Sequence, residues 1–360
     1  MNSNLAHHGG NLNEEARRLG CNIDQLLDAS ASIVPFKPPR SLHQSLFQAI
    51  SHKALRSYPD STYEDLRNAI AKWHNINPAL VLPGNGAAEL FTWAAREAKG
   101  VGVNCLPSPG FSDYSRALRC WDAQFIETPL PMSWPSKMPQ AFPLANQAEV
   151  IWITNPHNPT GQLWNKDSIE SLIKTHNLVI CDEAFLPLVP KGEKESMIPL
   201  VEKYPNLIVI RSLTKIFSIP GLRLGYAVSN PKRLRTWSTW RDPWPVNSLA
   251  VAGGISLMNN ESSLKSWIKK VHTWIEEEGD WLQAKLKEIP GITPKPSSVN
   301  FLLIQGETSL TTLRENLARQ MILVRDCRSF TYLGDNYLRI SFQNKAGNKR
   351  IIKALQQLLI

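Results

Sequence analysis

The chain has 360 residues, of which 42% are hydrophobic and 20% charged, as in a globular protein with a large core. Its formal net charge is +9, but the 40 basic residues are dispersed, so we expect small anionic ligands and no nucleic-acid partner. There is no apolar run of membrane-spanning length, no signal-peptide pattern and no CxxC pair among five cysteines, so we expect a cytoplasmic protein with reduced thiols, no membrane association and no metal site.

The first segment with a chemical signature is a glycine-containing turn before a helix. Gly84-Asn-Gly-Ala-Ala88 opens the helical stretch Glu89–Lys99. Free N–H groups at a helix N-terminus form a ready phosphate site. The glycine spacing is not that of a dinucleotide-binding fingerprint, which excludes NAD. Further along, the proline-rich Pro129–Pro143 is expected to be a surface excursion.

Short apolar runs alternate with helical segments in the middle of the chain. The helix Lys166–Thr175 begins after a capping region at Asn165 and Asp167. The expected strands are Val150–Thr154, Leu178–Cys181, Leu207–Arg211 and Leu224–Val228. This alternation predicts an α/β fold with a mostly parallel sheet, whose functional loops lie at the carboxyl ends of the strands.

The composition changes after Pro243-Trp-Pro-Val-Asn247. A long charged helix over Ser262–Glu288 is followed by the strand candidates Val299–Ile304, Ile322–Val324 and Tyr337–Phe342. We therefore predict a large domain at 40–245 and a smaller α+β domain formed by 1–39 and 246–360.

Lys215, Asp182 and Arg223 stand close to the predicted strand ends. An amine, an acid and a phosphate-binding arginine are what pyridoxal phosphate requires, since the protein orients this cofactor and tunes its electronics. Burial after an apolar strand should lower the pKa of the Lys215 amine and make it nucleophilic. A carboxylate at Asp182 would keep a pyridine nitrogen protonated. These residues predict a pyridoxal phosphate site.

The order of motifs resembles that of the fold type I pyridoxal phosphate enzymes, in the branch containing histidinol-phosphate aminotransferase and threonine-phosphate decarboxylase. The resemblance covers nearly the whole chain and implies a homodimer with active sites at the subunit interface. The motifs are Gly84-Asn-Gly86, Asn155-Pro-His-Asn-Pro-Thr-Gly161, Asp182-Glu-Ala184, Ser212-Leu-Thr-Lys215 and Gly221-Leu-Arg-Leu-Gly-Tyr226.

The resemblance implies a role for each matching residue. Lys215 would bind the cofactor covalently, Asp182 would pair with its pyridinium nitrogen, and Asn158 would contact its phenolic oxygen. Phe111 would stack on the ring, and Tyr58 of the partner subunit would reach the phosphate. The other phosphate ligands would be Gly86, Ala87, Ser212, Thr214 and Arg223.

Four features favour the decarboxylase within this branch. His8-Gly-Gly-Asn11 resembles its amino-terminal signature, in which a loop closes over the substrate. Phe185 stands where the aminotransferases usually have tyrosine, so Asn158 would act on the phenolic oxygen without a tyrosine partner. The other two are Pro243-Trp-Pro-Val-Asn247 and Val324-Arg-Asp-Cys-Arg-Ser-Phe330, which resemble decarboxylase segments.

The implied reaction is decarboxylation of L-threonine O-3-phosphate to (R)-1-amino-2-propanol O-2-phosphate in cobalamin biosynthesis. Arg339 would bind the substrate carboxylate, and His8, Arg325 or Arg328 would meet its phosphate. Gly9, Ser32 and Asn158 complete the predicted substrate site. Ser32 departs from the family pattern, which has asparagine there, so one substrate or closure contact is in doubt.

Two alternatives remain open. The same pocket performs transamination if the Cα–H bond lies perpendicular to the cofactor ring, so histidinol-phosphate aminotransferase or a related aminotransferase is the alternative enzyme. A cofactor-binding regulator without turnover is disfavoured, because the chain has no room for a helix-turn-helix ahead of its first motif.

Overall fold

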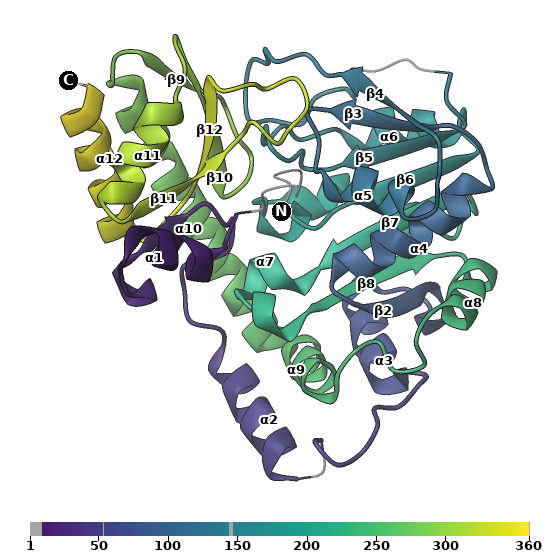
Figure 1. The fold of residues 1–360 in the computed structure, drawn as a ribbon. Helices are drawn as coiled ribbons and strands as arrows, with labels where there is room; N and C mark the ends of the chain where they lie inside the picture. The colour runs from purple at the N-terminus through teal and green to yellow at the C-terminus, as the bar shows by residue number, and fades with distance from the viewer. Residues whose placement is uncertain (1–8, 53, 144–146, 360) are drawn as a thin grey trace.

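The computed structural model of the chain describes residues 9–52, 54–143 and 147–359. Figure 1 shows two sheets side by side, each covered by helices. The strands of the larger sheet are β2 (Val81–Asn85), β3 (Asn104–Ser108), β4 (Phe125–Pro129), β5 (Val150–Thr154), β6 (Leu178–Asp182), β7 (Leu207–Ser212) and β8 (Leu224–Ser229). Their spatial order is β2-β8-β7-β6-β5-β3-β4.

The larger sheet is mostly parallel, as the alternation of strands and helices predicts. Only β8 runs against its neighbours, β2 and β7. The apolar segment Val150–Thr154 is buried along its whole length, as expected for a strand covered on both faces. The helices that accompany this sheet are α2 (Arg40–Ser51), α3 (Glu64–His74), α4 (Ala87–Lys99), α5 (Asp113–Arg119), α6 (Lys166–Ile173), α7 (Leu213–Phe217), α8 (Pro231–Trp240) and α9 (Ser248–Asn259).

Alternate residues of the central strands enter two different cores. Leu178 and Ile180 of β6 pack in a cluster with side chains of α4, α5 and α8. Val179 and Cys181 belong to the other cluster, to which α3, α6 and α9 contribute. This two-sided burial holds the carboxyl ends of β5, β6 and β7 in a fixed register, with Thr154 opposite Asp182 and Asp182 opposite Ile210.

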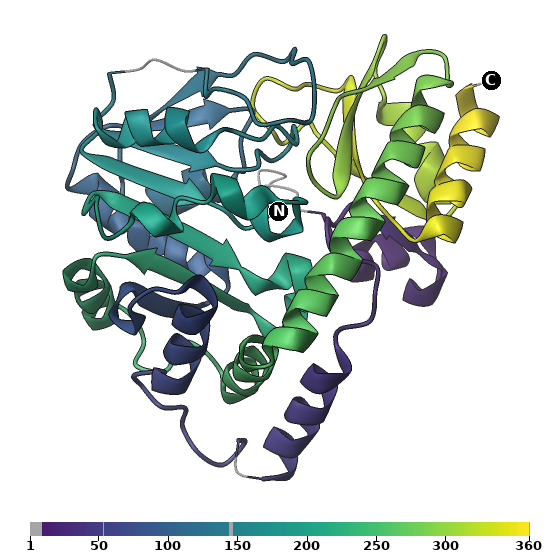
Figure 2. The same cartoon turned by 180° about the vertical axis from the view of Figure 1, so that it is seen from behind.

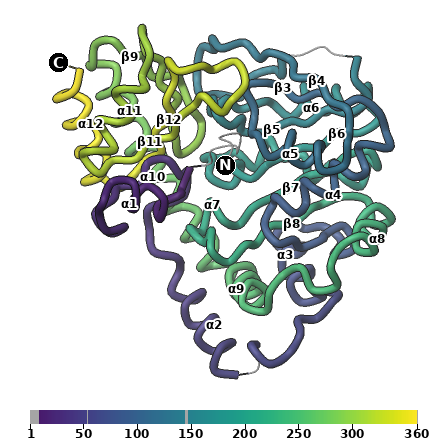
Figure 3. The backbone as a smooth tube through the Cα atoms, viewed as in Figure 1, coloured from purple at the N-terminus to yellow at the C-terminus, as the bar shows by residue number. Residues whose placement is uncertain are grey.

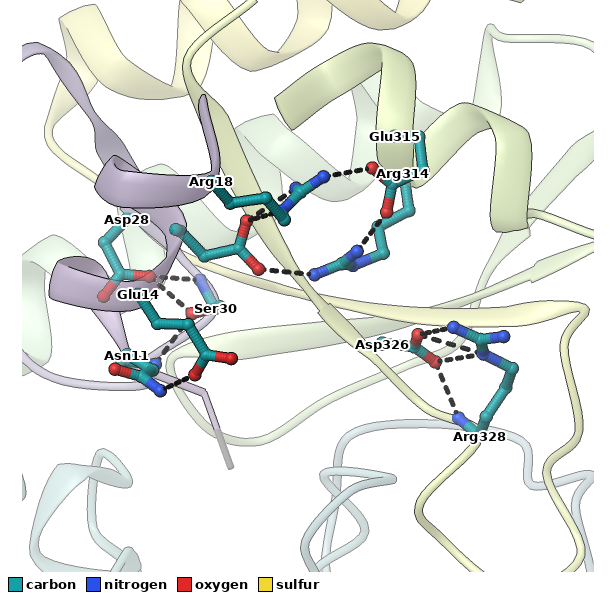
Figure 4. A network of polar contacts seen from close by, with 11 residues as sticks. Asn11, Glu14, Arg18, Asp28, Ser30, Arg314, Glu315, Asp326 and Arg328 are labelled. Atoms are coloured by element: carbon teal, nitrogen blue, oxygen red, sulfur yellow. Dashed lines mark hydrogen bonds and ion pairs between the residues drawn. The ribbon is translucent and has the colours of Figure 1, made fainter. Parts of the chain in front are cut away.

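The smaller sheet joins the beginning of the chain to its last third. Its order is β1-β11-β12-β10-β9, and β1 runs parallel to β11 with Leu27 opposite Ile322. Ion pairs from Arg18 to Glu315 and from Arg314 to Glu15 tie the first helix to α11 (Figure 4). The elements are α1 (Leu12–Leu19), β1 (Leu27–Ala29), α10 (Glu261–Lys287), β9 (Ile292–Pro294), β10 (Phe301–Gly306), α11 (Thr311–Arg319), β11 (Ile322–Asp326), β12 (Tyr337–Ser341) and α12 (Lys345–Leu359).

Two helices connect the halves of the molecule. Helix α10 runs from beside the larger sheet to the smaller sheet, as Figure 2 shows from behind. In Figure 3 the backbone passes from α1 to α2, which packs against α9 at the lower edge of the view. We keep the division into 40–245 and 1–39 with 246–360 as a proposal.

The proline-rich segment at 129–143 is irregular, but it is not entirely on the surface. Leu130 and Trp134 are buried, and the Trp134 indole donates to the Pro296 carbonyl, 2.9 Å away. The segment therefore fastens the two halves of the molecule together, which its proline content did not indicate.

Candidate active site

The carboxyl ends of neighbouring strands bring four of the predicted residues to one cavity of about 250 Å³. Asp182 ends β6 and Ser212 ends β7, while Asn158 follows β5. Lys215 lies in α7, which begins directly after β7 with Ser212 as its N-cap. The cavity is lined by Gly9, Ser30, Ala31, Ser32, Ala87, Ala88, Phe91, Phe111, Asn158, Asp182, Ala184, Phe185, Ser212, Thr214, Lys215, Arg223, Arg325, Phe330 and Arg339.

One end of the cavity is built for a phosphate. Helix α4 points its N-terminus there, with Ala87 as its first residue and Gly86 as its N-cap at φ 74°. A Cβ on Gly86 would lie 2.4 Å from the Arg223 guanidinium, so only glycine lets the arginine approach this turn. Thr214 and Ser212 add hydroxyl groups to the same lining. Backbone N–H groups, hydroxyls and an arginine form an anion site.

Lys215 lines the cavity with most of its side chain covered, beside apolar and cationic neighbours. Its Nζ lies 5.5 Å from the centre of the Phe185 ring. Burial, together with the charges of Arg339 and Arg223, lowers the pKa of the amine from 10.5 to about 8, and the Asp182 carboxylate opposes this change. At pH 7 about a tenth of such an amine is neutral, far more than in an ordinary lysine, which suits a residue that links to an aldehyde.

Asp182 is held by hydrogen bonds at both carboxylate oxygens. The Ala184 N–H donates to Oδ1 at 2.9 Å, and the Tyr114 hydroxyl donates to Oδ2 at 2.5 Å. Burial raises the pKa of Asp182 from 3.8 to about 6, against the lowering by these two bonds and by Lys215. A bound pyridinium would favour the carboxylate form further.

The other end of the cavity contains two buried arginines from paired strands. Arg325 of β11 lies opposite Arg339 of β12. Arg339 donates to the Asn158 amide oxygen and to the Ser30 carbonyl, while its Nε has no partner among the described residues. Arg325 donates to the Ser329 hydroxyl at 2.6 Å. Burial lowers the pKa of each guanidinium, that of Arg339 to about 10, so an anion placed between them would be bound strongly.

The amino-terminal segment closes one side of the cavity. Gly9 lines it, and the next residue, Gly10, donates its N–H to the Ser30 hydroxyl at 2.9 Å. Figure 4 shows Ser30 in turn bonded to the Asp28 carboxylate. Ser32 also lines the cavity, but its hydroxyl is bonded to that of Ser341 at 2.7 Å. The missing amide at position 32 is thus replaced by a buried pair of hydroxyls.

Three predicted residues stand apart from this cavity. Arg328 is half exposed and ion-paired with Asp326, as Figure 4 shows, and does not line it. Tyr58 is 76% exposed and stacks on Trp244, with ring centres 4.2 Å apart. His8 lies outside the described residues.

The sequence did not single out Ser30, Ala184, Phe330 or Tyr114. Ala184 and Phe330 each end a motif quoted for other residues, Tyr114 lies three residues after Phe111, and Ser30 lies two residues before Ser32. Only the fold shows that Tyr114 reaches Asp182, because 68 residues separate them.

A larger cavity of about 380 Å³ lies near α10. Its lining combines apolar side chains such as Val189 and Ile275 with the ion pair between Lys137 and Asp280. It contains neither Lys215 nor the arginines of the strand ends. Over the described ranges no cluster of side chains suits a metal ion, and no helix is long and apolar enough to cross a membrane.

The site fits pyridoxal phosphate. The cradle at Gly86 and Arg223 suits its phosphate, Asp182 its ring nitrogen and Lys215 its aldehyde, with Phe111 and Ala184 in the lining between them. We propose these roles for the residues named.

Comparison with known proteins gives three findings. The family model for aminotransferase class I and II matches residues 24–355. The chain is 33% identical to threonine-phosphate decarboxylase of Salmonella typhimurium, with 98% of this chain and 96% of the relative covered. It is 28% identical to the adenosylcobalamin biosynthesis bifunctional protein CobDQ of Leptospira interrogans, over 99% of this chain and 41% of that protein.

Solved structures share the fold. A histidinol-phosphate aminotransferase from Sinorhizobium meliloti, in complex with pyridoxal-5'-phosphate, superposes with a TM-score of 0.83 at 19% identity, covering 97% of this chain and 95% of that one. The predicted fold class is confirmed.

Proposed function

Because the chain belongs to the class I and II aminotransferase family, we propose that it is a pyridoxal phosphate-dependent decarboxylase in cobalamin biosynthesis. Its substrate is L-threonine O-3-phosphate, and its products are carbon dioxide and (R)-1-amino-2-propanol O-2-phosphate. The likeness to threonine-phosphate decarboxylase over almost the whole length of both chains supports this assignment.

The charges that line the cavity support a phosphorylated amino acid as the substrate class. Arg223, Arg325 and Arg339 line one cavity, and within the described residues none of them forms an ion pair with a carboxylate. Arg325 and Arg339 are buried, and buried cations require anionic partners, so the bound molecules must bring them. The cofactor brings one phosphate, and a phosphorylated amino acid brings a carboxylate and a second phosphate.

The chain's own residues divide the work. Bound pyridoxal phosphate supplies an aldehyde that links to amines and a protonated ring that withdraws electrons. Lys215 holds the cofactor and then carries a proton to the substrate α-carbon. Asp182 keeps the ring nitrogen protonated. Arg339 binds the substrate carboxylate next to Asn158, and Phe185 keeps this side of the cavity apolar.

We assign the substrate phosphate to Arg325 in preference to Arg328. Arg325 is buried in the cavity lining and faces Arg339 across two paired strands. Arg328 is already neutralised by Asp326 at 2.6 Å and points to solvent. Gly9 and Ser30 would then cover the substrate from the amino-terminal side.

The homodimer is also a proposal. Exposed apolar side chains gather on α2 and the segment after it, where Phe47, Leu55 and Tyr58 are each more than two-thirds exposed. An apolar surface of this kind marks an interaction site. A partner subunit docked there would bury Tyr58, which by the family resemblance would contact the phosphate of the cofactor bound in the other subunit. The cytoplasmic location and the absence of a nucleic-acid partner stay predictions from the sequence.

The deciding experiment gives the cofactor-loaded protein L-threonine O-3-phosphate without any keto acid. Stoichiometric carbon dioxide and 1-amino-2-propanol phosphate over many turnovers would establish the decarboxylase. Absence of carbon dioxide, with conversion of the cofactor to its pyridoxamine form by histidinol phosphate, would establish the aminotransferase alternative.

A matched pair of variants tests the phosphate assignment. Loss of one hydrogen-bonded charge is worth roughly 1.5–3 kcal/mol, so Arg325→Gln should lower kcat/KM by about 10- to 100-fold. Arg328→Gln, three residues away, should change kcat/KM less than about twofold, since surface ion pairs contribute little. The reverse pattern would transfer the role to Arg328.

A further inference from the structure

The hydroxyl of Tyr114 is directed at the carboxylate of Asp182. Tyr114 lies in α5 and is almost completely buried, with its hydroxyl 2.5 Å from Asp182 Oδ2 and 2.8 Å from Thr154 Oγ1. A tyrosine hydroxyl has one proton, and Asp182 as a carboxylate is only an acceptor. The proton therefore belongs to the bond with Asp182, and Thr154 must donate to the Tyr114 oxygen.

This arrangement is a directed chain of three groups. Thr154 ends β5 and Asp182 ends β6, and the two residues are opposite each other in the parallel register. Tyr114 bridges them from the helix that covers this face of the sheet. Because each hydroxyl in such a chain polarises the next, the bond to Asp182 is strengthened by Thr154.

Packing keeps the tyrosine ring in place. Its centre lies 5.1 Å from the ring of Phe91, 5.6 Å from that of Phe111 and 5.3 Å from that of Trp152. The first two are edge contacts and the third is tilted, and packing on several sides holds the ring in one orientation. Phe111 also lines the cavity, so one segment of chain contributes a ring beside the cofactor and the partner of the acid that would bind it.

We propose that Tyr114 is a positioning residue for the cofactor: it holds Asp182 as a carboxylate, aimed at the pyridinium nitrogen, and sets how strongly the acid competes for the ring proton. The proposal rests on the role of Asp182 in the proposed function, but not on the identity of the substrate. A less acidic Asp182 would take the proton from the ring and weaken its ability to withdraw electrons.

The other groups around Asp182 cannot replace this bond. The Ala184 N–H occupies the other oxygen, Oδ1. Lys215, from α7, lowers the pKa of Asp182 through its charge, whereas Glu183, the residue after β6, raises it. Lys215 no longer carries a free ammonium group once it is linked to the cofactor, so Tyr114 remains the fixed side-chain hydrogen-bond donor to Asp182 in the holoenzyme.

The test compares Tyr114→Phe with Tyr226→Phe. Each change removes one hydroxyl from a buried tyrosine, but the Tyr226 hydroxyl is bonded to His74 at 2.7 Å. Cofactor binding by the full-length proteins is titrated through tryptophan fluorescence between pH 5 and 9. The protonation of the ring nitrogen is read from the ¹⁵N shift of labelled cofactor.

In the wild type, binding should weaken as the pH falls through about 6, where Asp182 takes up its proton. In Tyr114→Phe the midpoint should rise by about one to two pH units, because a hydrogen bond to a charged group is worth roughly 1.5–3 kcal/mol. The dissociation constant at pH 7 should then rise roughly two- to tenfold, as the competent carboxylate falls to between about a half and a tenth of the protein. The ¹⁵N shift should move towards that of a neutral pyridine.

Each result decides the proposal. Equal midpoints and equal ¹⁵N shifts in the two phenylalanine variants would overturn it, since the tyrosine would then serve packing alone. If Tyr114→Phe does not fold, Thr154→Val removes only the second donor and should shift the midpoint in the same direction by a smaller amount; no shift would count against the proposal. An unchanged midpoint in Asp182→Asn would show instead that Asp182 does not bind the ring, whatever substrate the enzyme uses.

Discussion

Replacing the buried lysine should make the cofactor-free protein more stable at neutral pH. The pKa of Lys215 falls from 10.5 to about 8, so this residue contributes stability above pH 10.5 that is lost as the pH falls through about 8. At pH 7 the difference corresponds to roughly 3 kcal/mol, since one pKa unit is about 1.36 kcal/mol. Lys215→Met keeps the length and apolar stem of the side chain and removes the charge.

The net gain in the free energy of unfolding should be smaller than this value, because losing the Lys215 charge also affects Asp182. The Lys215 charge lowers the pKa of Asp182, so the variant leaves this acid harder to ionise. We therefore expect a net increase of about 2 kcal/mol in the free energy of unfolding at pH 7, shrinking towards zero near pH 10.

Urea unfolding of cofactor-free protein at pH 7 and pH 10 measures this difference. Lys353→Met, at an exposed position of α12, is the control for replacing a lysine by methionine. A gain that is the same at the two pH values, or a loss of stability at pH 7, would show that Lys215 is not buried as a destabilising charge. Loss of the visible absorbance of the lysine-linked cofactor in the same variant checks its chemical role.

Three further variants test other parts of the site. Asp182→Asn should stabilise the cofactor-free protein by about 2–3 kcal/mol at pH 7.5 and by much less near pH 4. The reason is that the pKa of Asp182 is raised to about 6, so the wild type loses stability as the pH rises through that value. Urea unfolding at the two pH values measures the difference. Gly86→Ala should raise the dissociation constant of the cofactor roughly tenfold, since the φ of 74° at Gly86 and its contact with Arg223 leave no room for a Cβ. An unchanged dissociation constant in a fluorescence titration would contradict this prediction. Arg211→Met should cost about 3–5 kcal/mol, because it strands the buried Glu183 carboxylate 2.7 Å away; the double variant with Glu183→Gln should recover much of that loss in the same assay.

The sequence predicted the strands that carry the site because their composition leaves little choice. Val150–Thr154 is a short run of β-branched and aromatic residues that is apolar up to its last position, and the structure gives it the same bounds. Strand β3 was missed because Asn104 and Pro107 weaken the pattern, and β1 because three residues are too few to show one. Hydrogen bonding to neighbouring strands, which composition does not reveal, decides these cases.

The sequence likewise identified some residues of the candidate site and could not distinguish others. Motifs identify Lys215, Asp182 and Arg223 because each stands at an end of a recognisable strand: Asp182 ends β6, Lys215 follows β7 and Arg223 directly precedes β8. Arg325 and Arg328 are indistinguishable in the sequence, since they lie three residues apart in one motif. The structure separates them because β11 ends at Asp326, which leaves Arg325 within the sheet and Arg328 beyond it.

The pairing of β1 with β11 has a consequence for synthesis of the chain. The 295 residues from Leu27 to Ile322 must be added before the first strand meets its partner. At about 5–20 residues per second, this takes roughly 15–60 s on the ribosome. During that interval Ser30 and Ser32 have no sheet to hold them, and the larger sheet can form around β5 to β8 alone. We expect a nascent chain that acquires its cofactor-binding half first and becomes able to hold its substrate only at release.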